Sequence, residues 1–205
     1  GHVAEEVYTK LGQLDYAAEL AQIRAQKPDA VFFFLPGGMG INFVKQFVSA
    51  GLSRDTQLFA PGFSADEDVI KAVGAPMMGM FNSSHWAHDM DNAENKRFVA
   101  DFQKEYGRLP SLYASQGYDA ALLMDGAVRD VKGKVEDKAA LQKALEAKRF
   151  KSVRGDFKFN SNHYPVQNYY LRVIGKDASG RVTNKMMGSI FTNHADAYVA
   201  QCKMK

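Results

Sequence analysis

An uninterrupted apolar run lies at residues 30–35, where the sequence reads AVFFFL. Because its positions do not alternate between apolar and polar, the run predicts a strand that is covered on both faces. Pro36, Gly37 and Gly38 break it. Apolar residues then recur every three or four positions and predict a helix closed by Gly51, with an inner face of Ile41, Val44, Phe47 and Val48.

The segments before and after residues 30–51 also alternate between helix and strand. A helical spacing precedes the run, ends at residues 27–29 and places on one face Tyr16, Leu20 and Ile23. A strand predicted at residues 57–60 is followed by a capping-box pattern at 64–67, in which Ser64 is expected to cap the next helix. Another short strand is predicted at residues 78–82. This alternation of strand, glycine-bearing turn and helix is typical of a parallel α/β fold.

The second half of the chain is richer in helices. A second capping-box pattern at residues 91–94 predicts a helix that Gly107 stops and that carries Phe98, Phe102 and Tyr106. Helices are also predicted at residues 111–130, with Tyr118, Ala121 and Val128 inward, and at residues 137–148, with Leu141 and Leu145 inward. Strands follow at residues 156–159, 167–174 and 189–191.

Two glycine-bearing loops follow predicted parallel strands, at residues 35–39 and 60–64. In open parallel sheets, ligands bind just beyond the carboxyl ends of the strands. Glycine lets a ligand approach the backbone, and each loop leads into a helix whose first N–H groups favour an anion. The loops therefore suggest a site for a small anion, and ordinary strand-to-helix turns are the alternative interpretation.

Composition narrows the classes of protein that remain. Among 205 residues, 46% are hydrophobic and 24% charged, and no apolar stretch approaches the ~20 residues of a membrane helix. The net charge of +3 is spread along the chain, and its densest basic group, within residues 148–158, reads as a solvated face, so no nucleic-acid partner is expected. The single cysteine, Cys202, excludes a disulfide within the chain.

Other constellations of reactive side chains are incomplete. His85 and His88 could share a metal on a helix, but no cysteine or spaced acid completes the set. Ser83 and Ser84 lack a nucleophile elbow, and the glycines at residues 37–40 lack dinucleotide-loop spacing. No metal, cofactor or catalytic residue is therefore expected. Arg154 and Gln116 are left as lone polar residues that could contact a carboxylate.

Five phrases of the sequence are distinctive when taken together and in this order: LDYAAELAQI at residues 14–23, VKQFVSAGL at 44–52, FVADFQKEY at 98–106, YDAALL at 118–123 and VRGDFKFN at 153–160. They resemble the type I periplasmic binding proteins, specifically the leucine/isoleucine/valine-binding family. The resemblance extends over nearly all of the chain.

The resemblance implies an α/β, two-lobed, parallel-sheet fold, of which this chain is expected to be a C-terminal part lacking most of lobe one. Residues 1–84 are expected in lobe two, and residues 85–160, including a crossover at 85–91, return to lobe one as helices. Residues 161–205 then form a crossover and the last strands of lobe two. The lobe-one helices would lack the sheet they pack on, so the missing N-terminal part or a second copy is an expected partner.

The resemblance also implies ligand-binding positions. The aromatic residue that follows the first strand in amino-acid binders corresponds to Pro36, beside Gly37 and Gly38. Their acidic partner of the ligand ammonium corresponds to Gly62, beside Phe63. An aromatic position of lobe one is retained as Tyr113. Trp86 and His85, near the crossover, are further candidates for cleft-lining residues, with plain packing as the alternative.

A buried ammonium without a carboxylate is costly, so the loss of the acid at position 62 argues against a simple amino-acid ligand. The resemblance then predicts a receptor of an ABC importer that binds a small carboxylic acid, preferably aromatic, outside the cytoplasm, in the periplasm or on a lipid anchor. Its partners would be this ligand and the membrane permease. The alternatives are a branched-chain amino-acid receptor, the sensing domain of a regulator, and an enzyme of flavodoxin-like fold.

Overall fold

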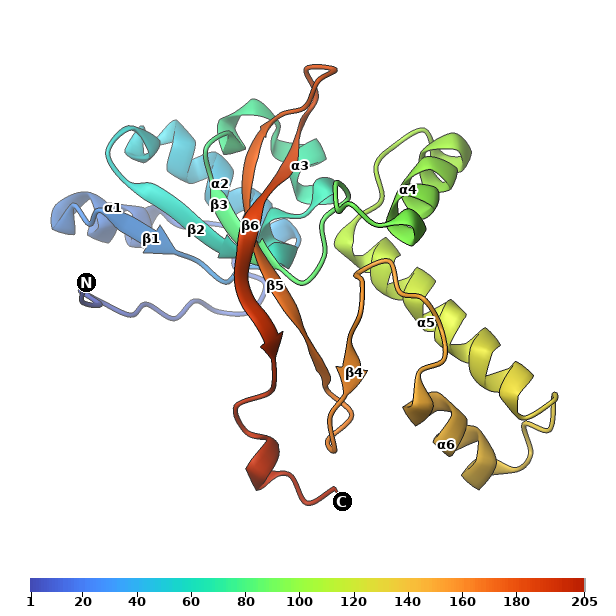
Figure 1. Cartoon of the computed structure of the whole chain (residues 1–205). Coiled ribbons are helices and arrows are strands. Elements are labelled where there is room, and N and C mark those ends of the chain that lie inside the picture. Colours follow the sequence, from blue (N-terminus) through green and yellow to red (C-terminus); the bar gives the residue numbers. More distant parts are fainter. Residues whose placement is uncertain (205) are drawn as a thin grey trace. The chain divides into compact units, whose positions relative to one another are not determined.

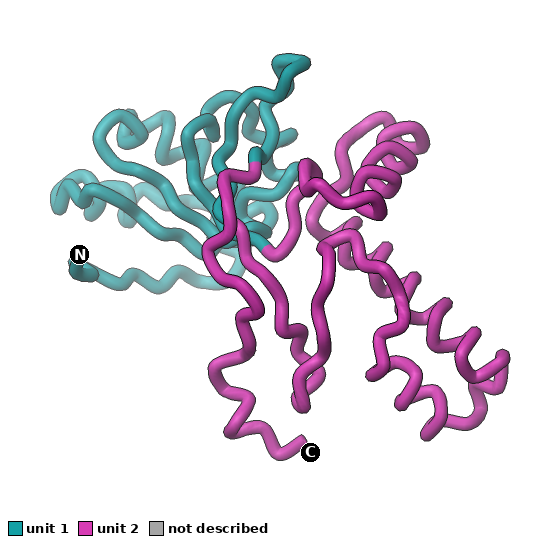
Figure 2. Tube along the Cα trace, viewed as in Figure 1, with its two compact units in different colours: residues 1–84, 171–185 teal, residues 85–170, 186–205 magenta. Residues whose placement is uncertain are grey.

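The parallel strands of the first half set the architecture in a computed structural model that describes residues 1–204 (Figure 1). The chain folds into two compact units, residues 1–84 with 171–185 and residues 85–170 with 186–205 (Figure 2). The strands are β1 (Ala30–Phe32), β2 (Gln57–Pro61), β3 (Phe81–Ser84), β4 (Lys158–Phe159), β5 (Pro165–Lys176) and β6 (Val182–His194). The α-helices are α1 (Ala17–Gln26), α2 (Gly38–Ser49), α3 (Glu67–Val73), α4 (Ala93–Tyr106), α5 (Leu112–Asp130) and α6 (Lys138–Ala147).

In the first unit, β1, β2 and β3 are parallel neighbours. The register pairs Phe32 with Phe59 and Phe59 with Phe81, so three phenylalanines form a row across one face of the sheet. The opposite face packs on Tyr16, which precedes α1, and on side chains from the three helices, among them Leu20, Phe43, Phe47, Val69 and Ile70. This cluster is the core of the unit. Tyr16 belongs to it, and burial of its ring raises the pKa of the Tyr16 hydroxyl.

The prediction that residues 30–35 are covered on both faces is wrong. Phe33 and Leu35 are buried, whereas Phe32 is 66% exposed and Phe34 63% exposed. The run therefore alternates as a half-covered strand does, although every residue in it is apolar. The three helices of the unit contribute to one core cluster on one side, and in residues 1–204 no helix covers the row of phenylalanines.

Side-chain caps decide where several helices begin. Ser111 caps α5 and Asp137 caps α6, each accepting a hydrogen bond from the backbone N–H three residues on. The predicted capping box at residues 91–94 is wrong in its first member, because Asn92 is the cap and exposed Asp91 pairs with Lys96 instead.

The capping box predicted at residues 64–67 does not form. The segment Gly62–Ala65 is a 3₁₀ turn, and α3 begins after Asp66 without a side-chain cap. The turn carries Ser64 into the interior, where its hydroxyl is fully buried without a hydrogen-bond partner in the described chain. Glu67 reaches to β6 instead of back to the turn.

The second unit contains α4, α5 and α6 with short stretches of strand. α5 buries Leu112, Ser115, Asp119 and Ala127, and α6 buries none of its residues. The expected inward position of Ala121 is wrong, since its side chain is exposed. β4 is shorter than predicted, β5 is longer, and the strand predicted at residues 189–191 is part of β6.

The two units do not follow the predicted segments at the C-terminus, where residues 171–185 lie in the first unit and residues 186–204 in the second. β5 and β6 each contribute residues to both units. The assignment of residues 1–84, 85–160 and 161–205 to two lobes stays a prediction. None of the described helices is long and apolar enough to cross a membrane.

A fully buried amide organises the start of the second unit. The Asn95 Oδ1 atom accepts a hydrogen bond of 2.7 Å from the Trp86 indole, and its amide donates to the carbonyls of Ala87, His88 and Met90. Asn95 therefore satisfies the polar groups of a buried loop that has no regular secondary structure.

We predict that Asn95→Ala lowers the free energy of unfolding by about 3 kcal/mol, because it removes a buried amide that forms several hydrogen bonds at once. Chemical denaturation of the full-length protein measures the change. Asn42→Ala is the control, because the Asn42 amide donates to the Gly38 carbonyl in an exposed hydrogen bond within α2, and its effect should stay within about 0.5 kcal/mol. Equal losses in the two variants would contradict the assigned role of Asn95.

Candidate functional site

The parallel register gathers two loops and the end of β3 at one end of the first unit. Pro61 pairs with Ser83, so the 3₁₀ turn after β2 lies beside the end of β3. The loop at residues 35–38 follows β1 at the same end, because all three strands run in the same direction. The structure thereby brings together the sequence-predicted residues Pro36, Gly37, Gly38, Gly62 and Phe63 within one unit.

An aromatic pair links two of these loops. The rings of Phe34 and Phe63 lie 4.7 Å apart between centroids at 81°, an edge-to-face contact. Sequence reasoning named Phe63 and missed Phe34, which it assigned to a fully covered strand. The alternation of exposure in the run was hidden because every residue from 30 to 35 is apolar.

The loop after β1 places two glycines at the N-terminus of α2. Gly37 has φ +56°, a left-handed conformation that disfavours larger side chains. Gly38, the first residue of α2, has no atom within 4 Å of the place where a Cβ would lie. Because both residues are glycines, no side chain of their own covers the backbone N–H groups of this turn.

Gly62 is required for space rather than for backbone conformation. A Cβ at this position would lie 2.9 Å from the carbonyl oxygen of Ser83, 2.9 Å from the Ser84 Cβ and 3.0 Å from Nη2 of Arg172. A β-carbon essentially never approaches a backbone oxygen so closely, so no side chain fits without movement of the loop. The packing around position 62 therefore leaves no room for an acidic side chain.

The guanidinium beside Gly62 is one of the most buried side chains of the chain. Arg172, on β5, is 1% exposed. Its Nη2 donates to the Gly62 carbonyl at 3.3 Å and its Nε to the Asn82 side-chain oxygen at 2.7 Å. Sequence reasoning missed Arg172, because a single arginine in an apolar strand gives no local signal of the loop it contacts.

A line of buried amides extends from this guanidinium. The Asn82 amide donates to the Asn184 side-chain oxygen at 2.8 Å, and the Asn184 amide donates to the Ala65 carbonyl and to the Glu67 carboxylate. Glu67 also accepts from the Thr183 hydroxyl, so it is committed to β6 and is not placed to bind a ligand ammonium. The line holds both ends of the turn at residues 62–65.

The remaining predicted site residues belong to the second unit. His85 makes an edge-to-face contact with Tyr169 at 6.4 Å between ring centroids. Trp86 is 1% exposed and packs on Phe98 while its indole bonds to Asn95, an arrangement that favours a packing role. Tyr113, in the first turn of α5, is 55% exposed.

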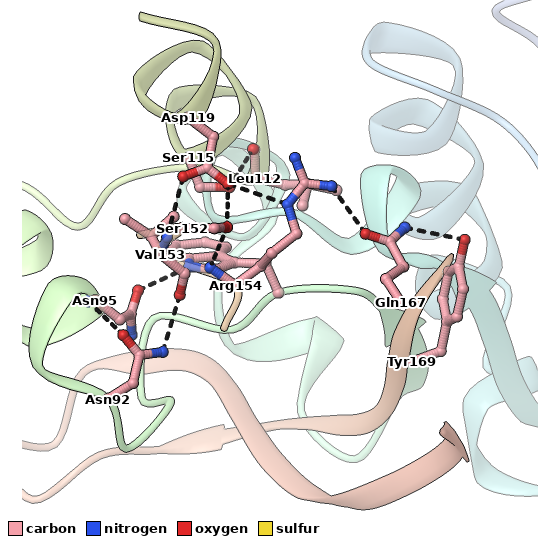
Figure 3. A network of polar contacts seen from close by, with 11 residues as sticks. Asn92, Asn95, Leu112, Ser115, Asp119, Ser152, Val153, Arg154, Gln167 and Tyr169 are labelled. Carbon is pink, nitrogen blue, oxygen red and sulfur yellow. Dashed lines mark hydrogen bonds and ion pairs between the residues drawn. The ribbon is translucent and has the colours of Figure 1, made fainter. Parts of the chain in front are cut away.

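A second polar network in this unit surrounds Asp119 (Figure 3). The buried Asp119 carboxylate accepts from the Ser152 hydroxyl, from the Val153 backbone and from Nε of Arg154 at 3.0 Å. Nη1 of Arg154 donates to Gln167 at 2.8 Å. Arg154, a candidate for carboxylate binding, is thus held between α5 and β5, whereas the other candidate, Gln116, is exposed on α5.

Two cations adjoin the Asp119 network and lie over one aromatic ring. The Arg154 guanidinium lies 4.4 Å from the ring centre of Phe157, and the Lys148 ammonium lies 4.3 Å from the same ring. Burial of the Lys148 side chain lowers its pKa, and the neighbouring Asp156 carboxylate opposes this effect. The network therefore fastens the segment at residues 152–157 to α5, which is a structural task.

The two loops and the end of β3 offer aromatic rings, backbone groups and a buried cation. No group of His, Cys, Asp and Glu in residues 1–204 is arranged to hold a metal ion. A shallow cavity of about 80 Å³ lies at the amino-terminal end of β2, lined in part by Val44, Pro76 and Met78, and is remote from the loops. The arrangement suits binding of a flat, partly apolar molecule.

We predict that Gly62→Ala lowers the free energy of unfolding by about 1–3 kcal/mol, because the added methyl group overpacks against a backbone oxygen. Gly38→Ala is the matched control, since it adds the same methyl group in open space at the first residue of a helix and should be neutral or slightly stabilising. Denaturant melts of the two variants test the difference, and equal effects would show that the packing at Gly62 is not restrictive.

Comparison with known proteins agrees with this architecture. A model of the periplasmic binding protein family matches residues 1–179. The Leu/Ile/Val-binding protein homolog 6 of Brucella melitensis is 31% identical over 190 residues, which are 90% of this chain and 48% of that protein. The chain thus spans about half the length of the curated relatives it matches.

Solved structures of solute-binding proteins also superpose on this chain. A solute-binding protein of an ABC transporter from R. palustris, in complex with benzoate, superposes with a TM-score of 0.89 at 35% identity and covers 99% of this chain and 54% of its own. Another solute-binding protein from R. palustris, in complex with 4-hydroxybenzoate, superposes with a TM-score of 0.85 at 27% identity. The superposition covers 95% of this chain and 54% of that chain. A leucine-binding protein from Thermotoga maritima shares the fold at 19% identity and a TM-score of 0.76. The superposition covers 91% of this chain and 51% of that chain.

These similarities confirm the predicted α/β fold and the family resemblance. The chain belongs to the type I periplasmic binding proteins, in the leucine/isoleucine/valine-binding family.

Proposed function

We propose that this protein is the solute-binding receptor of an ABC importer and reversibly binds a small carboxylic acid, preferably an aromatic one. The observation that carries the proposal is the aromatic pair of Phe34 and Phe63 beside Gly62, at the carboxyl ends of parallel strands. Aromatic rings offer a large apolar surface to a flat ligand, and the loop backbone offers polar groups for its edge.

The packing at position 62 argues for an acid without an ammonium group. A carboxylate cannot be placed there without displacing the loop, and Glu67 is occupied by Thr183 and Asn184. A desolvated ammonium without a carboxylate partner is strongly unfavourable. The solved relatives in complex with benzoate and 4-hydroxybenzoate support the same ligand class, at 35% and 27% identity.

The proposed ligand contacts of the first unit are Pro36, Gly37, Gly38, Gly62 and Phe63, to which the structure adds Phe34. In the second unit, the resemblance to the family adds Tyr113, whose ring is accessible, and His85. Trp86 is included in the proposed site in a supporting role, because its buried ring and its hydrogen bond to Asn95 hold the loop that follows β3. No residue in this set is assigned a covalent role.

The remaining parts of the proposal follow from the family. Its members are solute-binding proteins rather than enzymes, which favours a role without catalysis. Membership also favours a location outside the cytoplasm and a membrane permease as the partner that receives the ligand. No cofactor is part of the proposal.

A branched-chain amino-acid receptor is the second candidate. The observation that favours it is the 31% identity to a protein named as a Leu/Ile/Val-binding homologue. This candidate requires a carboxylate other than one at position 62 to hold the ligand ammonium.

We predict that benzoate, 4-hydroxybenzoate or p-coumarate raises the melting temperature of the full-length protein, and that leucine, isoleucine and valine do not. A ligand at a hundred times its dissociation constant stabilises the fold by about 2.7 kcal/mol, which a thermal-shift assay detects easily. A shift with the amino acids alone would replace the proposal by the second candidate. The absence of a shift with any of the six ligands would reject both.

We further predict that Phe63→Ala weakens binding of the acid that shifts the melting temperature most by about tenfold, because it removes one ring of the aromatic pair. Isothermal titration of the full-length protein measures the affinity. Tyr198→Ala is the control, because this exposed ring lies outside the proposed contacts, and it should leave the affinity unchanged. An unchanged affinity in Phe63→Ala would remove the aromatic pair from the site.

A further inference from the structure

Tyr169, on β5, adjoins one of the proposed ligand contacts of the second unit. Its half-buried ring makes edge-to-face contacts with His85, at 6.4 Å between ring centroids, and with His194, at 5.7 Å. Its hydroxyl accepts a hydrogen bond of 3.2 Å from the Gln167 amide. The hydroxyl therefore lies at the end of a network of polar side chains, on a ring that touches a residue of the proposed site.

An arginine fixes the direction of the hydrogen bonds that lead to this hydroxyl (Figure 3). Nη1 of Arg154 donates to Oε1 of Gln167 at 2.8 Å. Because a guanidinium only donates, the side-chain oxygen of Gln167 must face Arg154, and its amide nitrogen must face Tyr169. An amide nitrogen also only donates, so the Tyr169 oxygen is the acceptor in this contact. The proton of the Tyr169 hydroxyl consequently points away from Gln167.

The other end of this line of hydrogen bonds is anchored in the interior of the unit. Nε of Arg154 donates to the Asp119 carboxylate at 3.0 Å, and Asp119 is 2% exposed and accepts two further hydrogen bonds from residues 152–153. Gln167 is also buried. Buried hydrogen bonds that follow one direction polarise one another, so the last donor of the line is strengthened. That last donor is the Tyr169 hydroxyl.

The described part of the chain contains no acceptor for this last proton. In residues 1–204 the Tyr169 oxygen takes part in one hydrogen bond, which it accepts from Gln167. A hydroxyl that accepts on one side and is polarised from behind is a good donor to an oxygen that only accepts. An ionised carboxylate is such a group, and it forms stronger hydrogen bonds than a neutral acceptor does.

We propose that Tyr169 is a specificity-determining residue that donates a hydrogen bond from its hydroxyl to the ligand carboxylate. Gln167, held by Arg154, is a positioning residue that directs the hydroxyl proton outward. The inference rests on the proposed function and adds a residue that recognises the acid group itself. Aromatic contacts do not distinguish an acid from a neutral molecule of the same shape, whereas a directed donor does.

The test uses whichever of benzoate, 4-hydroxybenzoate and p-coumarate binds most tightly, together with its primary amide, which has the same shape and no charge. Isothermal titration of the full-length protein measures both affinities. Tyr169→Phe should weaken binding of the acid about twentyfold and of the amide about threefold, because a hydrogen bond to a charged group contributes more than one between neutral groups.

Tyr170→Phe is the matched control. It removes the same hydroxyl from the next residue of β5, whose side chain points to the opposite face of the strand. The Tyr170 hydroxyl also accepts from an amide, that of Asn168, but the Asn168 oxygen is held by the backbone N–H of Asn193 and not by a cation. This variant should leave the affinities for the acid and for the amide unchanged.

A second variant reverses the last hydrogen bond of the line without removing the tyrosine. In Gln167→Glu, the new carboxylate accepts from Arg154 and also from Tyr169, which turns the hydroxyl proton inward. The affinity for the acid should fall about tenfold. The same substitution in the Tyr169→Phe background should weaken binding less, because no hydroxyl proton is left to redirect. The difference between the two backgrounds separates this redirection from repulsion between two carboxylates.

The outcomes separate the inference from the proposed function. If wild type and Tyr169→Phe bind the acid equally well, the hydroxyl donates to solvent, and the inference is overturned while the proposed function stands. Equal weakening of acid and amide also overturns it, because a purely structural change affects both ligands. Equal effects of Gln167→Glu in the two backgrounds overturn the positioning role of Gln167. A wild type that binds none of the three acids overturns the inference together with the proposed function.

Melting curves of the ligand-free variants show that each is folded. Tyr169→Phe keeps the ring and its contacts with His85 and His194, so its melting temperature should stay close to that of the wild type. Should this variant fail to fold, Gln167→Glu, which leaves Tyr169 in place, still tests the inference, and an unchanged affinity of Gln167→Glu for the acid would overturn it.

Discussion

The hydrogen bonds of Arg172 to the turn after β2 and to Asn82 on β3 connect elements that are far apart in the sequence. They join β5 to the carboxyl ends of two parallel strands, and the amide line through Asn184 continues the connection to β6 and α3. Because each of these groups is buried, loss of one partner would leave the others unsatisfied. The geometry of the turn at residues 62–65, and with it the proposed ligand site, depends on this connection.

The sheet of the first unit is covered by its helices on one face only. The row of Phe32, Phe59 and Phe81 lies on the opposite face, and Phe34 extends it toward the loops. The same strands therefore serve two purposes, since their inward residues form the core while an outward residue next to the strand end contacts Phe63. This explains how an apolar run can alternate in burial without alternating in polarity.

Two buried polar side chains organise irregular backbone in the second unit. Asn95 satisfies the loop around Trp86, and Asp119 fastens the segment at residues 152–154 to α5. These side chains form several hydrogen bonds each, so they fix irregular backbone that no helix or strand would hold. They define the positions of His85 and Tyr113 only indirectly, through the loop and the helix that carry them.

The sequence by itself determined the order of the helices, the parallel α/β order and the family, because hydrophobic periodicity and family phrases are properties of short segments. The two predicted capping boxes did not form as predicted, since α3 has no side-chain cap and Asn92 caps α4. The sequence also indicated Gly62 and Phe63 as site residues through the resemblance. Only the tertiary structure decided which face of residues 30–35 is covered, that Trp86 is buried, and that Phe34 and Arg172 contact the turn of the proposed site. The physical reason is distance along the chain: Arg172 meets Gly62 across 110 positions, and such a contact leaves no trace in local sequence patterns.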